Sequence, residues 1–403
     1  MNDKNTIRVS VVCFLIFVSA AGSAQDTWTD VSRIVAVGDV HADYDQLLTV
    51  LKMADLVDKR GKWIGGQTHL VQTGDIPDRG PDSARIIRYL GRLESQARRK
   101  GGYVHLLIGN HEVMNVYGDL RYVHPDEYKV LIDRNSVRRR DRYYKLYIDQ
   151  LKPTLPVEQA VVFDDAYREA WRKKYPLGFV EHRSVWSRGG EFGKRVSAHN
   201  TIIKINDLLF VHGGISSALK DMTLTEINRQ ISKELNTVPY PAVNLMDSQT
   251  GPLWYRGTAH NSVDVELPVL VSQLERFGAS RVVMGHTTTL GAVRPRFGGK
   301  AIFIDVGLSK TYGGRLACLL IEDGRFYGLH RGEKIRLPER DENLLSYYKK
   351  AASLDPAPSP LNELVTYFSG TPEVWDPPIN FGRSIVTPRP AGTPPQQPGG
   401  LVR

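Results

Sequence analysis

Short apolar runs that stop at a glycine or a polar residue recur along this chain. Residues 34–37 precede Gly38-Asp39, and residues 70–73 precede Gly74-Asp75. Runs this short and this apolar are typical of strands that are buried on both faces. Four further runs of the same kind lie at residues 104–108, 208–211, 282–284 and 302–304. The pattern predicts buried strands with polar side chains at their ends.

Helical patterns separate the first three runs. Between the first and second runs, one helical face is formed by Leu47, Leu48, Leu51 and Ala54. Between the second and third runs, another is formed by Ile86, Leu90, Leu93 and Ala97. Strand, helix and strand in this order predict an α/β fold, in which ligands gather at the carboxyl ends of the strands. Residues 316–321 and 326–329, joined by Asp323-Gly324, predict a hairpin.

The composition is that of a globular protein with a basic surface. The 403 residues are 41% hydrophobic and 24% charged, which excludes a wholly disordered or fibrous chain. The net charge of +9 favours anionic partners such as phosphate esters, nucleic acid or a membrane face. The chain has only two cysteines, so a disulfide-stapled scaffold is excluded.

The amino terminus has the pattern of a secretory signal. Lys4 and Arg8 precede an uncharged apolar run at residues 9–21, and small residues at 22–24 follow it. The run is shorter than the roughly 18 apolar residues that a membrane span needs. We therefore expect residues 1–24 to be removed, leaving a secreted or periplasmic protein without a stable membrane anchor. Cys318 would then be the remaining cysteine, and its apolar run predicts a buried strand position.

Two parts follow the signal. Residues 25–350 are expected to form the catalytic domain, and residues 351–403 a Pro-rich tail that is largely disordered from about residue 371. Within the domain, residues 119–195 carry 17 Lys and Arg against 12 Asp and Glu residues. We interpret this stretch as a mostly helical, basic insertion that caps or flanks the site. The alternative is a solvated helical face without a role in substrate binding.

Polar clusters at the predicted strand ends carry the candidate chemistry. They are Gly38-Asp39-Val40-His41, Gly74-Asp75-Ile76-Pro77-Asp78-Arg79-Gly80, Gly109-Asn110-His111-Glu112, Val211-His212-Gly213-Gly214 and Gly285-His286-Thr287. We expect all of them to lie at the same edge of one sheet, so that folding buries carboxylates and imidazoles together. That burial costs several kcal/mol unless a cation compensates. Imidazole, carboxylate and amide ligands suit zinc, iron or manganese.

The ordered set resembles the calcineurin-like metallophosphoesterases. Asp78-Arg79-Gly80 and Asn110-His111-Glu112 resemble the PPP-type protein phosphatases. Three looser phrases resemble the Shewanella-like protein phosphatase branch, namely Trp186-Ser187-Arg188-Gly189-Gly190, Phe210-Val211-His212-Gly213-Gly214 and Leu253-Trp254-Tyr255-Arg256-Gly257. The resemblance implies two packed mixed β-sheets flanked by helices, to which this chain adds the basic insertion.

The resemblance also implies a role for each matching residue. Two divalent or trivalent ions (Mn, Fe or Zn) would be bound by Asp39, His41, Asp75, Asn110, His212 and His286, with Asp75 shared by both. Arg79 would hold the phosphoryl oxygens, and Arg256 and Arg188 are further candidates for substrate binding. His111 would be the general acid, oriented by Asp78. His260 is a rival to His286 as ligand, and Asp305 could either support a ligand or cap a turn.

The implied function is a binuclear metal-dependent phosphatase that hydrolyses phosphomonoesters by direct attack of a metal-bridging hydroxide. A protein phosphatase acting on phosphoserine, phosphothreonine or phosphotyrosine is the first hypothesis. A periplasmic small-molecule phosphomonoesterase or nucleotidase is the second, and a non-catalytic phosphate-binding protein is the third. Nucleic-acid binding rests on charge alone, because the sequence shows no base-stacking or groove-binding module, so we predict no specific nucleic-acid partner. The physiological substrate and oligomeric state stay open.

Overall fold

Two six-stranded mixed sheets form the centre of the protein. The computed structural model describes residues 25–155, 161–242 and 244–370. One sheet, called the β2 sheet here, has the strand order β12-β11-β10-β2-β3-β4. Its strands are β2 (Arg33–Val37), β3 (His69–Gln72), β4 (Tyr103–Leu106), β10 (Ala317–Glu322), β11 (Arg325–His330) and β12 (Glu333–Arg336). The predicted hairpin is the β10–β11 pair, whose strands run antiparallel.

The second sheet, called the β6 sheet, has the order β1-β5-β6-β7-β9-β8. Its strands are β1 (Thr27–Trp28), β5 (Ile202–Ile205), β6 (Leu208–Val211), β7 (Arg281–Met284), β8 (Arg294–Arg296) and β9 (Ala301–Phe303). Strands β2, β3 and β4 are parallel to each other, and so are β6, β7 and β9. Parallel neighbours end at the same edge, so each sheet gathers the polar residues that follow its strands.

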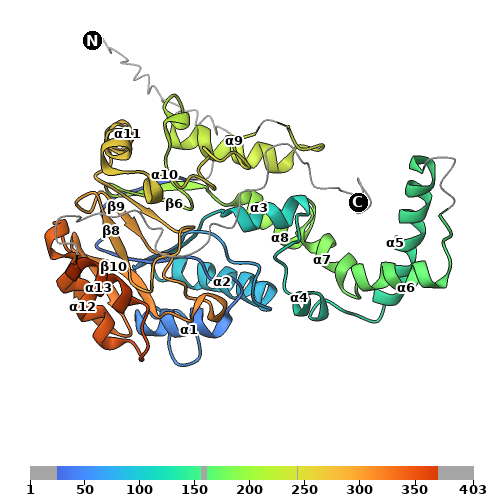
Figure 1. Cartoon of the computed structure of the whole chain (residues 1–403), viewed down its shortest axis with the longest axis horizontal. Coiled ribbons are helices and arrows are strands. Elements are labelled where there is room, and N and C mark those ends of the chain that lie inside the picture. Colours follow the sequence, from blue (N-terminus) through green and yellow to red (C-terminus); the bar gives the residue numbers. More distant parts are fainter. Residues whose placement is uncertain (1–24, 156–160, 243, 371–403) are drawn as a thin grey trace, which may run out of the picture.

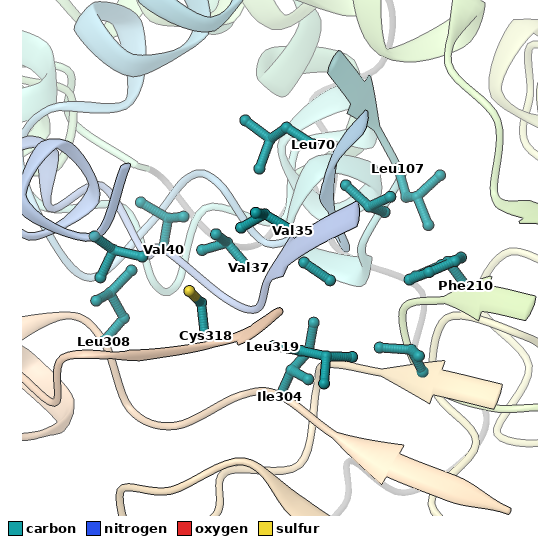
Figure 2. Packing of buried hydrophobic residues seen from close by; sticks show 14 of the residues in the cluster. Val35, Val37, Val40, Leu70, Leu107, Phe210, Ile304, Leu308, Cys318 and Leu319 are labelled. Atoms are coloured by element: carbon teal, nitrogen blue, oxygen red, sulfur yellow. The ribbon is translucent and has the colours of Figure 1, made fainter. Parts of the chain in front are cut away.

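Apolar side chains from both sheets meet in one core. Figure 2 shows Val35 and Leu319 of the β2 sheet close to Phe210 of the β6 sheet, with Leu107 beside them. These side chains are at most 1% exposed, which accounts for the uniformly apolar strand sequences. Cys318 lies in β10 as a free, fully buried thiol. The two-sheet α/β architecture predicted above is therefore confirmed.

Helices flank the sheets (Figure 1). Residues that favour capping mark the start or the end of several of them. For example, the side chain of Asp43 accepts a hydrogen bond from Gln46 N at the start of α1, and Gly118 ends α3 with a φ of 97°. The helices are α1 (Tyr44–Met53), α2 (Ser83–Arg98), α3 (Asn110–Tyr117), α4 (Pro125–Lys129), α5 (Ser136–Leu151), α6 (Asp165–Lys174), α7 (Phe179–Trp186), α8 (Glu191–Ala198), α9 (Leu224–Asn236), α10 (Gly257–His260), α11 (Val263–Arg276), α12 (Leu344–Leu354) and α13 (Leu361–Gly370).

Helices α5 and α6 project from the rest of the molecule as an arm (Figure 1). A separate aromatic cluster, which includes Tyr143 of α5 and Trp171 of α6, lies within this region. Trp186 of α7 and Phe192 of α8 are instead buried in the main core. The interval 119–195 is therefore not one unit, because its last part packs against the sheets while its middle part forms the arm.

The carboxyl-terminal helices extend the compact body beyond the expected boundary. Tyr348 of α12 and Phe368 of α13 stack with ring centroids 5.5 Å apart, and both are buried in the main core. The packed body therefore reaches residue 370, not residue 350.

The predicted signal at residues 1–24 and the Pro-rich stretch from residue 371 lie outside the described residues. None of the helices within the described ranges has the length and apolarity needed to span a bilayer.

Candidate metal centre and active site

The loop that follows β2 brings Asp39 and His41 to the sheet edge. Both side chains are buried, and the backbone N–H groups of Val40 and His41 donate to Asp75 O at 3.0 Å. His41 and Ala42 have φ values of 44° and 54°, a left-handed conformation that favours glycine. Glycine would adopt this conformation at a lower cost than the alanine at position 42.

The loop after β3 carries three further predicted residues. Asp75, Asp78 and Arg79 all have positive φ values, between 58° and 72°. Each such non-glycine residue costs of the order of 1–3 kcal/mol and is retained only where the surrounding structure fixes it. Gly109 allows this loop to approach α3, since a Cβ at that position would collide with Asp75 Oδ1. The strain is concentrated where the predicted ligands and Arg79 are presented.

Two ligand candidates come from the other sheet. His212 follows β6 and His286 follows β7, whereas Asp39, Asp75 and Asn110 follow strands of the β2 sheet. The expectation that all clusters lie at the edge of one sheet is therefore wrong. The two sheets pack face to face, so their edges adjoin. His286 N donates to Asp39 Oδ1 at 3.0 Å, which links the two sheets directly at the site.

These side chains converge around Asp75. His212 Nε2 lies 2.8 Å from Asn110 Oδ1, 3.1 Å from His286 Nδ1 and 3.4 Å from Asp75 Oδ1. On the other side, Asp75 Oδ2 lies 4.0 Å from His41 Nε2. Ligand atoms come close enough to hold an ion in two groups, Asp75 with His212 and His286, and Asp75 with His41 and His111. Asp75 belongs to both groups, as a bridging ligand must.

Electrostatics favours cations at this position. Burial together with Asp305 and Asp75 raises the pKa of Asp39 well above its usual value. Burial opposes ionisation of Asp75 too, but His212 and His111 hold its pKa well below the usual value. Burial lowers the pKa of His41 to about 3, so this imidazole is neutral, as a metal ligand requires. His286 Nε2 is buried without a partner among the described residues. Clustered carboxylates, neutral imidazoles and an unpaired ring nitrogen fit bound metal ions.

His111 and Asp78 form a close pair beside the ligands. His111 Nδ1 lies 2.6 Å from Asp78 Oδ2, and both residues are buried. Burial disfavours the charged imidazole, but Asp75 and Asp78 together raise the pKa of His111 above its usual value. With Nδ1 turned to Asp78, Nε2 faces Asp75 at 3.8 Å from Oδ2. The pair therefore has the geometry of an oriented proton donor.

The three candidate arginines differ in position. The guanidinium of Arg79 lies 3.8 Å from the centroid of the Tyr122 ring, and its Nε is buried without a partner among the described residues. Arg256 Nη1 donates to His286 O and to Thr287 Oγ1, both at 2.9 Å, so Arg256 holds the loop of a predicted ligand. Arg188 is exposed and donates to Asn236 O at 2.7 Å. The contacts of Arg188 therefore do not connect it to the predicted ligands.

Two residues with alternative roles can also be placed. His260 lies in α10, is only half-buried, and belongs to neither ligand group, whereas His286 does. Asp305 Oδ2 accepts from Thr288 Oγ1 at 2.8 Å, and its Oδ1 accepts from Gly307 N at 3.1 Å. Asp305 therefore fixes the turn after β9, and its charge also raises the pKa of Asp39.

Sequence reasoning gave no role to Glu112, which organises the loops around Asp75. Its carboxylate accepts from Gly109 N at 2.8 Å, Asp75 N at 2.9 Å and Ile76 N at 2.7 Å. The signal was present in the sequence, because a glutamate at the third position of a helix is the capping-box pattern. What the sequence cannot show is that two of the three donors come from a different loop.

We expect Glu112→Ala to destabilise the folded protein strongly. The substitution leaves three buried N–H groups without an acceptor, at ~1–3 kcal/mol for each. The free energy of unfolding from urea titration should therefore fall by about 3 kcal/mol or more. Glu127→Ala is the matched control, because buried Glu127 accepts one backbone hydrogen bond, from Ser83 N. Equal losses in the two variants would contradict the organising role of Glu112.

Comparison with known proteins identifies the family. The model of the calcineurin-like phosphoesterase family matches residues 32–289. The chain belongs to this family. It is 29% identical over 306 residues to Shewanella-like protein phosphatase 2 of Arabidopsis thaliana. The aligned region covers 69% of this chain and 72% of that relative. It is 26% identical over 262 residues to Shewanella-like protein phosphatase 1 of Plasmodium berghei, covering 63% of this chain and 61% of that relative.

A solved structure is similar as well. The cold-active protein-tyrosine phosphatase of a psychrophilic Shewanella species is 32% identical in sequence, with a TM-score of 0.58. The similarity covers 78% of this chain and 82% of that one. The predicted family and its Shewanella-like relatives are thus confirmed. This chain is a metal-dependent phosphoesterase hydrolase with phosphatase homologues.

Proposed function

We propose that this calcineurin-like enzyme is a binuclear protein phosphatase that hydrolyses phosphomonoesters. The observation that carries the proposal is the convergence of two ligand groups on Asp75, directly beside the His111–Asp78 pair. Asp39, His41, Asp75, Asn110, His212 and His286 would hold the two ions. When bound, such ions neutralise phosphoryl oxygens and lower the pKa of a water molecule toward ~7.

The chain's own residues would bind and orient the phosphate ester. Arg79 would contact the phosphoryl oxygens, because its fork suits paired oxygens and its buried Nε lacks another partner among the described residues. His111 would donate the proton at Nε2 to the leaving oxygen, while Asp78 holds Nδ1. Positioned proton donors of this kind typically contribute ~10²–10⁴-fold to the rate. Arg256 would orient the loop of His286.

A phosphoprotein is the proposed substrate class, and phosphotyrosine is the first residue to test. The solved neighbour from Shewanella is named a protein-tyrosine phosphatase, and the relatives in Arabidopsis and Plasmodium are named protein phosphatases. The purified protein should be assayed for bound metals and then for hydrolysis of phosphotyrosine, phosphoserine and phosphothreonine peptides, an aryl phosphate and nucleotides.

We expect kcat/KM for the preferred phosphopeptide to exceed that for nucleotides by at least about tenfold, or ~1.4 kcal/mol. The Asp75→Asn variant, purified in the same way, controls for contaminating phosphatases. Higher kcat/KM with nucleotides would instead favour a small-molecule phosphomonoesterase. Full metal content without hydrolysis of any ester would favour a phosphate-binding protein.

We also propose that the enzyme acts outside the cytoplasm. The support is the signal pattern of residues 1–24, and cleavage after Ala24 would leave β1 (Thr27–Trp28) and its pairing with β5 intact. Amino-terminal sequencing of the protein from the periplasm or medium should begin at Gln25. Recovery of the full-length chain only, in the cytoplasm, would contradict export.

A further inference from the structure

Asn115 lies one turn after His111 on α3 and is 1% exposed. Its Nδ2 donates to Asp78 Oδ1 at 2.9 Å and to the carbonyl oxygen of His111 at 3.0 Å. Both partners are acceptors, so the amide nitrogen must face them and the orientation of the side chain is fixed. Asn115 Oδ1 has no partner among the described residues. Both hydrogen bonds of this side chain therefore go to the His111–Asp78 pair.

The Asp78 carboxylate is held at both oxygens. Oδ2 lies 2.6 Å from His111 Nδ1, and Oδ1 accepts from Asn115. Asp78 lies in the loop after β3, outside any helix or strand, and its backbone φ is 72°. Asn115, in contrast, lies on a helix whose first residues include His111. This donor therefore ties the carboxylate to the element that carries the imidazole.

The insertion anchors the end of this helix. Arg183 of α7 donates from Nη1 to Asn115 O at 2.5 Å and from Nη2 to Val116 O at 3.1 Å. These carbonyl groups lie in the last turn of α3, where a cation is favourable. Arg183 thus keeps the backbone at Asn115 in place while the side chain of Asn115 holds Asp78.

We infer that Asn115 is a positioning residue for proton donation by His111. By holding Asp78 Oδ1, it keeps Oδ2 on His111 Nδ1 and directs Nε2 toward the leaving oxygen of the substrate. The inference rests on the proposed function, in which His111 is the general acid. Asn115 would then affect protonation of the leaving group and would not affect metal binding.

Leaving-group dependence tests this role. A proton donor matters little for 4-nitrophenyl phosphate, whose leaving phenolate is stable, and much for phenyl phosphate, whose leaving phenolate is more basic. We expect Asn115→Leu and Asn115→Asp to lower kcat for phenyl phosphate by roughly 10- to 100-fold, the value of a hydrogen bond to a charged group. With 4-nitrophenyl phosphate we expect a loss below about threefold, and bound metal should stay at the wild-type level.

The matched control is Asn228→Leu. Asn228 Oδ1 accepts from Thr201 N and Ile202 N, and Nδ2 donates to Ile202 O, so it has a comparable structural role away from the site. Its loss should affect both esters equally. Equal losses with both esters in the two Asn115 variants would overturn the inference. His111→Asn separates this outcome from failure of the proposed function, because absence of leaving-group dependence in that variant would remove His111 itself as the acid.

Discussion

Replacing Asp75 with asparagine is expected to remove both bound metal and activity. Asp75 belongs to both ligand groups, and its Oδ1 also accepts from His111 N at 2.9 Å. Asparagine keeps the shape and this acceptor but lacks the negative charge that two cations would share. Outer-shell changes alone cost ~10–100-fold in metal affinity, so loss of a shared ligand should cost more. We expect metal content to fall well below wild type and kcat/KM to fall by at least about 100-fold.

Metal analysis of the dialysed protein and thermal unfolding with and without added metal measure this effect. Because bound metal stabilises the folded state, wild-type Tm should rise when metal is added, and the variant should show little increase. Asp305→Asn is the matched control, since Asp305 is buried nearby but belongs to neither ligand group. Full retention of two metal ions by Asp75→Asn would contradict a bridging role.

Replacing His111 with asparagine is expected to lower kcat while leaving bound metal largely in place. The variant loses the proton donor at Nε2, although His111 also lies in one of the two ligand groups. Because a positioned acid contributes ~10²–10⁴-fold, we expect a loss of that order with phenyl phosphate and a much smaller loss with 4-nitrophenyl phosphate. Steady-state kinetics with both esters, together with metal analysis, measure the two effects separately.

His182→Asn provides the control for removing a buried imidazole. His182 lies in α7 and is 1% exposed, and its neighbours are aromatic rings of the insertion. That variant should lose stability without any dependence on the leaving group. If His111→Asn instead lost one metal ion and activity on both esters equally, His111 would be a ligand and not the acid.

Local sequence patterns determined most of the elements around the site. The run at residues 34–37 became part of β2, and Asp43 capped α1, since burial on both faces and capping depend on residues close in sequence. The carboxyl-terminal helices were not anticipated. The Pro-rich composition of residues 351–403 predicted a tail, but apolar residues of α13, such as Phe368, are buried in the main core.

The candidate site was predicted as a set of residues and not as an arrangement. Each ligand type followed from a polar residue at the end of an apolar run, and the family resemblance added the roles. Contacts that connect separate loops stayed hidden. Glu112 collects N–H groups from the β3 loop, and Asn115 reaches Asp78 over 37 positions. Such pairings depend on how loops pack, and one sequence contains no direct record of that.

By itself, the sequence determined the apolar strands, the helix signals and the chemistry offered at each strand end, because these depend on neighbours along the chain. Only the tertiary structure decided that the candidate ligands come from two sheets and meet at Asp75. It also decided that the three arginines diverge. Arg79 lies over the ring of Tyr122, Arg256 donates to His286 O, and Arg188 lies on the surface. The physical reason is that sheet packing and loop closure bring together residues that are far apart in sequence. His286 and Asp39, for example, are joined by a hydrogen bond across 247 positions.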